Sequence, residues 1–156
     1  MKRFNFVIVI VIILMIMTLT ACSPKVALSA DDFDSIMTAA GYGAMDGEFL
    51  LTDDSRNTGL LSYFIADCLS FHVEYFAFDS EMTARQNFNS FRNSFEDGRG
   101  RTSSTSEVNV SNYNKFTITT DGQFSVVTRV ENTLVVVSAS SEYKAEVNAV
   151  LDLLGY

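Results

Sequence analysis

The sequence predicts a single α+β domain in which helices pack on one face of an antiparallel sheet of about five strands. Runs rich in β-branched and aromatic residues alternate with stretches whose apolar residues recur every three or four positions, as in amphipathic helices. The connections between the last three runs are only two residues long, and such short links join antiparallel neighbours. Each apolar helix stripe must meet an apolar sheet face. The expected order is therefore helix, two strands, helix, three-strand meander, helix.

The first half of this domain should contain one helix and a strand hairpin. Two acidic residues closely follow Ser29, which is typical of a helix start, and apolar residues then recur at helical spacing to about residue 40. Residues 43–59 mix turn formers with a short apolar patch and have no clear assignment. Residues 60–66 and 69–78 are rich in aromatic and aliphatic side chains. They predict two paired strands, although the first run could also be helical.

A long amphipathic helix is predicted over residues 81–98. Asp79 and Ser80 are candidate N-cap residues, and phenylalanines recur along one side of the helix. We interpret this phenylalanine stripe as a face that packs on the core. The stretch at residues 98–112 is polar and low in aromatic residues, which predicts a mobile linker.

The last part of the chain should form a three-stranded meander and a final helix. Asp121-Gly122 is a strong hairpin signal, and Glu131-Asn132 is an equally short connection. Ser140 or Ser141 would cap the final helix, whose apolar residues again recur at helical spacing. The three strands are expected at about residues 115–120, 123–130 and 133–139.

The N-terminus has the features of a secretory signal. Lys2 and Arg3 precede an uninterrupted apolar run at residues 6–17, and small residues follow this run. A membrane-spanning helix needs about 20 apolar residues, so the run is short for a span. An uncleaved anchor helix and a plain secretory signal remain as alternatives.

Leu19, Thr20 and Ala21, followed by Cys22, resemble the lipobox of bacterial lipoprotein precursors. The resemblance implies that a dedicated signal peptidase recognises these three small or aliphatic residues and cuts before the cysteine. It also implies that a diacylglyceryl group is joined to the sulfur of Cys22. The protein would then be held on the extracytoplasmic face of the cell membrane by lipid, without a membrane span.

The same resemblance sets the expected domain organisation. Residues 1–21 would be the cleaved signal peptide, residues 22–29 a short lipidated tether, and residues 30–156 the single α+β domain. Cleavage would remove the two positive charges of Lys2 and Arg3 and no acid, so the formal charge of −8 would become −10. A surface this acidic disfavours nucleic-acid binding, because phosphate neutralisation needs a basic face.

With Cys22 joined to lipid, Cys68 is the one remaining cysteine. An internal disulfide and a cysteine-rich zinc site are then both excluded. No cofactor is expected. The mature chain should bury enough apolar surface to fold as one domain without such a cross-link.

Cys68 and His72 raise the question of an enzyme with a cysteine nucleophile. On an extended strand they would share one face with Glu74, but they would be about 13 Å apart, too far for a direct hydrogen bond. We therefore expect no enzyme activity, and interpret His72 and Glu74 as a polar pair on a sheet face. Two ligands are also too few for zinc, so no metal site is predicted.

Several polar residues are candidates for binding. Arg99 and Arg101 lie in a glycine-rich loop that could contact an anion or simply be solvated. If the helices cover one sheet face, the opposite face is partly free. Candidate polar positions on that face are His72, Glu74, Thr117, Thr119 and Arg129.

The expected function is a membrane-anchored, non-catalytic module that binds an envelope protein or peptide. The alternative is a small-molecule or ion-binding accessory lipoprotein of a transport system. An enzyme that uses Cys68 and His72 is the third and weakest hypothesis.

Overall fold

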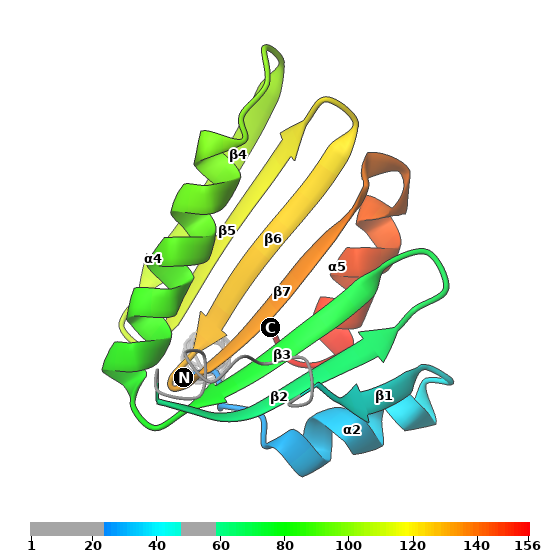
Figure 1. The fold of residues 1–156 in the computed structure, drawn as a ribbon, viewed down its shortest axis with the longest axis vertical. Helices are drawn as coiled ribbons and strands as arrows, with labels where there is room; N and C mark the ends of the chain where they lie inside the picture. Colours follow the sequence, from blue (N-terminus) through cyan, green and yellow to red (C-terminus); the bar gives the residue numbers. More distant parts are fainter. Residues whose placement is uncertain (1–23, 48–58) are drawn as a thin grey trace, which may run out of the picture.

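The computed structural model describes residues 24–47 and 59–156, which form a seven-stranded antiparallel sheet with three α-helices (Figure 1). The sheet order is β1-β2-β3-β7-β6-β5-β4. The elements in chain order are α2 (Ala30–Ala39), β1 (Gly43–Asp46), β2 (Leu60–Asp67), β3 (His72–Phe78), α4 (Glu81–Asp97), β4 (Ser103–Val110), β5 (Tyr113–Thr120), β6 (Gln123–Val130), β7 (Thr133–Ser140), a short 3-10 helix η2 (Ser141–Tyr143) and α5 (Lys144–Leu153). The predicted signal peptide and Cys22 lie outside the described residues.

The α+β class and the local signals for several elements are confirmed. The side chains of Ser29 and Ser80 cap α2 and α4 by accepting hydrogen bonds from backbone N–H groups three residues later. Asp121 and Gly122 both have positive φ angles, 47° and 82°, as a tight two-residue hairpin turn requires. The meander of β5, β6 and β7 is continuous, with every strand paired in register to the next.

The expected number of about five strands was too low, because β1 and β4 were missed. β1 falls in the segment that had no clear assignment. β4 occupies the stretch that we predicted to be a mobile linker, and it pairs with β5 over all eight of its residues. All eight residues of β4 are exposed, and apolar side chains alternate with polar ones only at its end, so most of the strand lacks the pattern by which strands are recognised.

The expectation that all helices pack on one face was also wrong. On one face, Ala84 and Phe88 of α4 pack against a cluster that includes Phe116, Val127 and Val136. On the other face, α2 and α5 cover the rest of the core (Figure 1). The reason lies in the central strands β6 and β7, which are apolar on both faces and so need cover on both.

None of the helices in residues 24–47 and 59–156 is long and apolar enough to span a membrane.

Candidate functional site

A cleft of about 590 Å³ opens between α4 and the strands β4 and β5. The α4 residues in the cleft recur at helical spacing, and β4 with the following turn and strand forms the opposite wall. The lining residues are Arg85, Phe88, Asn89, Arg92, Glu107, Asn109, Val110, Ser111 and Asn114. Phe88 forms an apolar floor because its ring is almost fully buried, and the other α4 residues in the cleft are polar. The cleft therefore combines hydrogen-bond donors and acceptors over an apolar base.

A chain of side-chain hydrogen bonds crosses the cleft from the core to the surface. Buried Asn114 donates from Nδ2 to Asn109 Oδ1 at 2.7 Å, and Asn109 donates to Glu107 Oε1 at 2.9 Å. The other carboxylate oxygen of Glu107 accepts from Arg92 Nη2 at 3.1 Å. Arg92 also forms an ion pair with Glu96, at 3.2 Å. These links hold the polar groups of β4, β5 and α4 in one arrangement.

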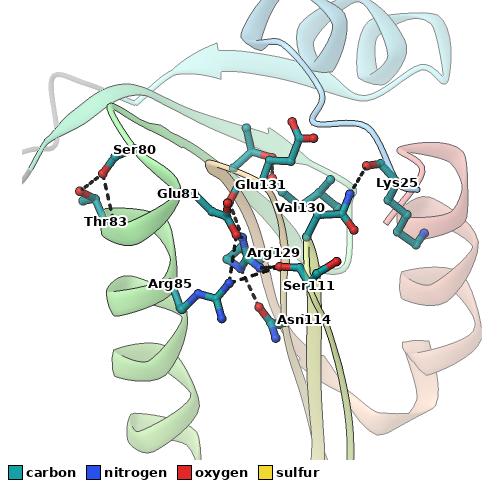
Figure 2. Close-up of polar contacts among 12 residues, drawn as sticks. Lys25, Ser80, Glu81, Thr83, Arg85, Ser111, Asn114, Arg129, Val130 and Glu131 are labelled. Carbon is teal, nitrogen blue, oxygen red and sulfur yellow. Dashed lines mark hydrogen bonds and ion pairs between the residues drawn. The ribbon is translucent and has the colours of Figure 1, made fainter. Parts of the chain in front are cut away.

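Arg129 on β6 holds the buried end of this hydrogen-bond network. Its guanidinium is fully buried, and Nε donates to Asn114 Oδ1 at 2.6 Å (Figure 2). Nη1 donates to Glu81 Oε1 at 3.1 Å and to the carbonyl of Glu131 at 2.6 Å, while Nη2 donates to the carbonyl of Ser111 at 3.3 Å. The prediction placed Arg129 on an exposed sheet face, which was wrong, because its side chain is committed to contacts within the chain.

Nearby donors and positive charges keep Glu107 in the cleft and Glu81 beside it ionised. A hydrogen bond from Arg85, together with the charge of Arg129, holds the pKa of Glu81 below its usual value. A hydrogen bond from Asn109 and the nearby Arg92 do the same for the pKa of Glu107. Positive and negative groups thus remain charged together near neutral pH.

The strand β4 beside the cleft is an open edge of the sheet. All eight of its residues are exposed, and β5 is its neighbour on one side. The other end of the sheet is different, because β1 is only four residues long and α2 packs against it. An edge strand directs every second pair of backbone N–H and C=O groups away from its neighbour, where another strand can pair with them.

His72 and Glu74 lie on the same sheet face as α4 but outside the cleft. Together with Tyr63 and Ile65 they line a second, smaller cavity of about 230 Å³. The Tyr63 hydroxyl donates to Glu74 Oε2 at 2.8 Å, which raises the pKa of Tyr63 in addition to the effect of its burial. The exposed His72 imidazole is 3.8 Å from the carboxylate of Asp67.

The remaining predicted binding residues do not join either cavity. Arg99 forms an ion pair with Glu96 at 3.3 Å, and Arg101 is exposed in the connection that leads to β4. Thr117 and Thr119 lie on the other face of the sheet, which α2 and α5 cover. Their β6 partners belong to the core cluster on that face. The five predicted sheet-face positions are therefore divided between two faces.

Cys68 and His72 are not brought together. Cys68 is buried in the cluster beneath α2 and α5, whereas His72 lines the smaller cavity on the opposite face. Burial and the adjacent Asp67 raise the pKa of the Cys68 thiol to about 11. Within residues 24–47 and 59–156, no group of three or more His, Cys, Asp or Glu side chains could hold a metal ion.

Sequence reasoning missed the cleft because it missed β4. Two signals could have found it. Arg85, Asn89 and Arg92 recur at helical spacing beside Phe88 of the phenylalanine stripe, and Val108 and Val110 alternate with polar residues at strand spacing.

Comparisons with known proteins assign no family. No family model matches the chain, and no curated protein sequence matches it significantly. Among solved structures, the chain has a distant similarity to the extracellular domain of PknH from Mycobacterium tuberculosis. The identity is 13%, the match covers 74% of this chain and 87% of that chain, and the TM-score is 0.34. A TM-score this low transfers no property from one protein to the other.

Proposed function

We propose that this protein is a lipid-anchored, extracytoplasmic module that binds an extended segment of a partner protein or peptide along β4 and catalyses no reaction. The lipobox-like residues Leu19 to Cys22 support the anchor. The open edge of β4 supports the binding mode. Addition of a strand to an exposed sheet edge is a common mode of peptide recognition, in which main-chain hydrogen bonds supply affinity and side-chain pockets supply specificity.

The observation that carries this proposal is the absence of protection on β4. Natural edge strands are usually short, or carry lysine, proline or a bulge that prevents pairing with other chains. β4 has eight residues without lysine or proline, and its register with β5 is unbroken. Its one charged side chain, Glu107, is paired with Arg92. An edge left open in this way is suited to receive another strand.

The cleft between α4 and β4 supplies the specificity in this proposal. Alternate side chains of an added strand point to the α4 side of the sheet, beside Arg85 and Asn109. Arg85 is about half exposed, with 51% of its side chain accessible, so it can reach a ligand. The mixture of guanidinium, amide and carboxylate groups favours polar side chains on the bound segment.

Selection from a displayed peptide library on the purified lipidated protein tests this function. Selected peptides should bind in an extended form and protect the backbone amides of β4 from hydrogen exchange. Thr105→Lys, which places a lysine on the edge, should abolish their binding, while Ser35→Lys on the exposed side of α2 is the matched control for added charge. Peptides that bind equally to both variants would contradict the proposed mode.

A second candidate function is binding of a small molecule or ion for a transport system. It is favoured by the size of the cleft, because pockets for small ligands usually enclose about 300–1,000 Å³. Thermal unfolding with a panel of amino acids, sugars and inorganic ions tests it. A ligand whose stabilising effect disappears in Arg92→Ala but persists in Thr105→Lys would favour this function over strand addition.

A further inference from the structure

The segment that precedes α2 is bound to the domain at three places. Asn112 Nδ2, in the turn between β4 and β5, donates to the carbonyl of Lys25 at 2.7 Å. Lys25 Nζ donates to the carbonyl of Gly155 at 2.7 Å, next to the C-terminal residue. The hydroxyl of Tyr75 on β3 donates to the carbonyl of Leu28 at 2.6 Å.

Packing adds to these hydrogen bonds. The ammonium group of Lys25 lies over the ring of Tyr113, 4.9 Å from its centroid. Ala27 and Leu28 are partly buried against the core on the face that α2 and α5 cover. Residues 25–28 are therefore part of the fold and do not behave as a flexible linker.

We propose that this docked segment determines which end of the domain faces the membrane. The inference rests on the lipid anchor of the proposed function and adds the orientation in which that anchor holds the binding edge. The membrane-facing end carries the turns at Ser111–Asn112 and Glu131–Asn132, together with Gly155 and Tyr156 at the C-terminus. The Asp121–Gly122 turn lies at the far end of the same strands (Figure 1).

The length of the connection restricts the distance to the bilayer. Lys25 is three positions after Cys22 in the sequence, and an extended chain covers at most about 3.6 Å per position, or about 11 Å in all. A strand of eight residues such as β5 is about 27 Å long. The anchor therefore cannot reach the end with the Asp121–Gly122 turn, whereas it easily reaches the end at Asn112.

Charge favours an upright domain. The chain has a net charge of −8, which becomes −10 after the proposed cleavage, and an anionic bilayer surface repels it. With its anchored end held close and its sides repelled, the domain projects from the membrane. The β4 edge then runs outward from Val110 near the bilayer to Ser103 at the far end.

This orientation argues against antiparallel pairing of the β4 edges of two copies. Antiparallel pairing of two β4 edges would place the anchored end of one copy beside the far end of the other. Two copies anchored in one membrane cannot adopt that arrangement. A partner segment that extends away from the bilayer can pair with β4 without this conflict.

Fluorescence quenching by lipids with a spin-labelled headgroup tests the orientation. The full lipidated chain, in a Cys68→Ala background, receives a fluorophore at Ser111→Cys or at Gln123→Cys, both exposed positions at opposite ends of the sheet. In vesicles of phosphatidylcholine and phosphatidylglycerol, quenching at position 111 should be at least twofold greater than at position 123. Lys25→Ala and Asn112→Ala, combined, should reduce this difference by at least half.

The possible results distinguish a failure of the proposed orientation from a failure of the proposed lipid anchor. Equal quenching at the two positions, or stronger quenching at position 123, would overturn the orientation while mass spectrometry still finds lipid on Cys22. A difference that persists unchanged in the Lys25→Ala, Asn112→Ala variant would show that docking does not set it. Mass spectra without lipid on Cys22 would overturn the proposed anchor itself. Thermal unfolding of each variant, and of Lys25→Ala alone, verifies that the domain remains folded.

Discussion

Glu81, the first residue of α4, accepts a hydrogen bond at 3.1 Å from the buried guanidinium of Arg129 on β6. The carboxylate also interacts favourably with the positive end of the helix dipole. Because Arg129 is fixed through Asn114 to the polar chain that crosses the cleft, this contact ties the start of α4 to the floor of the site.

Replacement of Arg129 by methionine should destabilise the protein by about 3 kcal/mol. The substitution keeps much of the side-chain volume but removes the ion pair with Glu81 and leaves the buried Asn114 Oδ1 without its donor, and an unpaired buried acceptor costs about 1–3 kcal/mol. Urea unfolding at pH 7 measures the effect. Arg85→Ala is the control, because its ion pair with Glu81 is half exposed and should contribute less than about 1 kcal/mol. Equal losses in the two variants would contradict the assigned role of Arg129.

Acid should weaken the contact between Glu81 and Arg129. The pKa of Glu81 is lower in the folded protein than its ordinary value of 4.5, so the unfolded chain takes up the proton first as pH falls. The stabilisation is therefore complete above pH 4.5 and is lost as pH falls through the folded pKa. The free energy of unfolding of Glu81→Gln, measured from pH 7 to pH 3, should converge on that of the wild type at low pH. A constant difference between the two proteins across this range would rule out the ionic contribution.

Cys68 should react slowly with thiol reagents in the folded protein. Its pKa of about 11 lies about two units above the usual value of 9.0, which lowers the thiolate fraction at pH 8 roughly 100-fold. Burial restricts access further. The rate of alkylation by iodoacetamide at pH 8 should rise at least 100-fold when urea unfolds the chain. Rapid alkylation of the native protein would contradict the buried position.

The strands of the central sheet could be predicted because the apolar pattern of each strand reflects which of its faces are buried. Val126 and Val127 on β6, like Val135 and Val136 on β7, are neighbours that point to opposite faces and are both buried. A continuous apolar run of this kind indicates cover on both faces, and it could have corrected the one-face prediction. The caps of α2 and α4 and the two-residue turns were predictable for a different reason, since they depend on local backbone chemistry. The predicted cap at Ser140 or Ser141 was wrong, because a 3-10 turn precedes α5 and neither serine side chain caps it.

The candidate site was harder to predict because it depends on contacts between distant residues. Arg129 and Glu81 are 48 positions apart, and Arg129 looks like an ordinary solvent-facing residue in a strand. Its burial follows from the position of α4, which no local pattern specifies. Tertiary packing likewise determines on which face of the sheet the side chains of His72 and Cys68 lie. The polar sequence of β4 resembles a loop until β5 is placed beside it.

A photo-crosslinking residue at Ser104 on β4, in the membrane of the native host, tests whether β4 receives a strand from a partner. We expect a cross-link to one defined protein segment, identified by mass spectrometry, that disappears when Thr105→Lys is added. The same segment, as a synthetic peptide, should bind the purified protein and protect the β4 amides from hydrogen exchange. The crosslinker placed at Ser35 on α2 should not capture it. Capture of the same segment from Ser35, or capture from Ser104 that Thr105→Lys leaves unchanged, would contradict strand addition at β4.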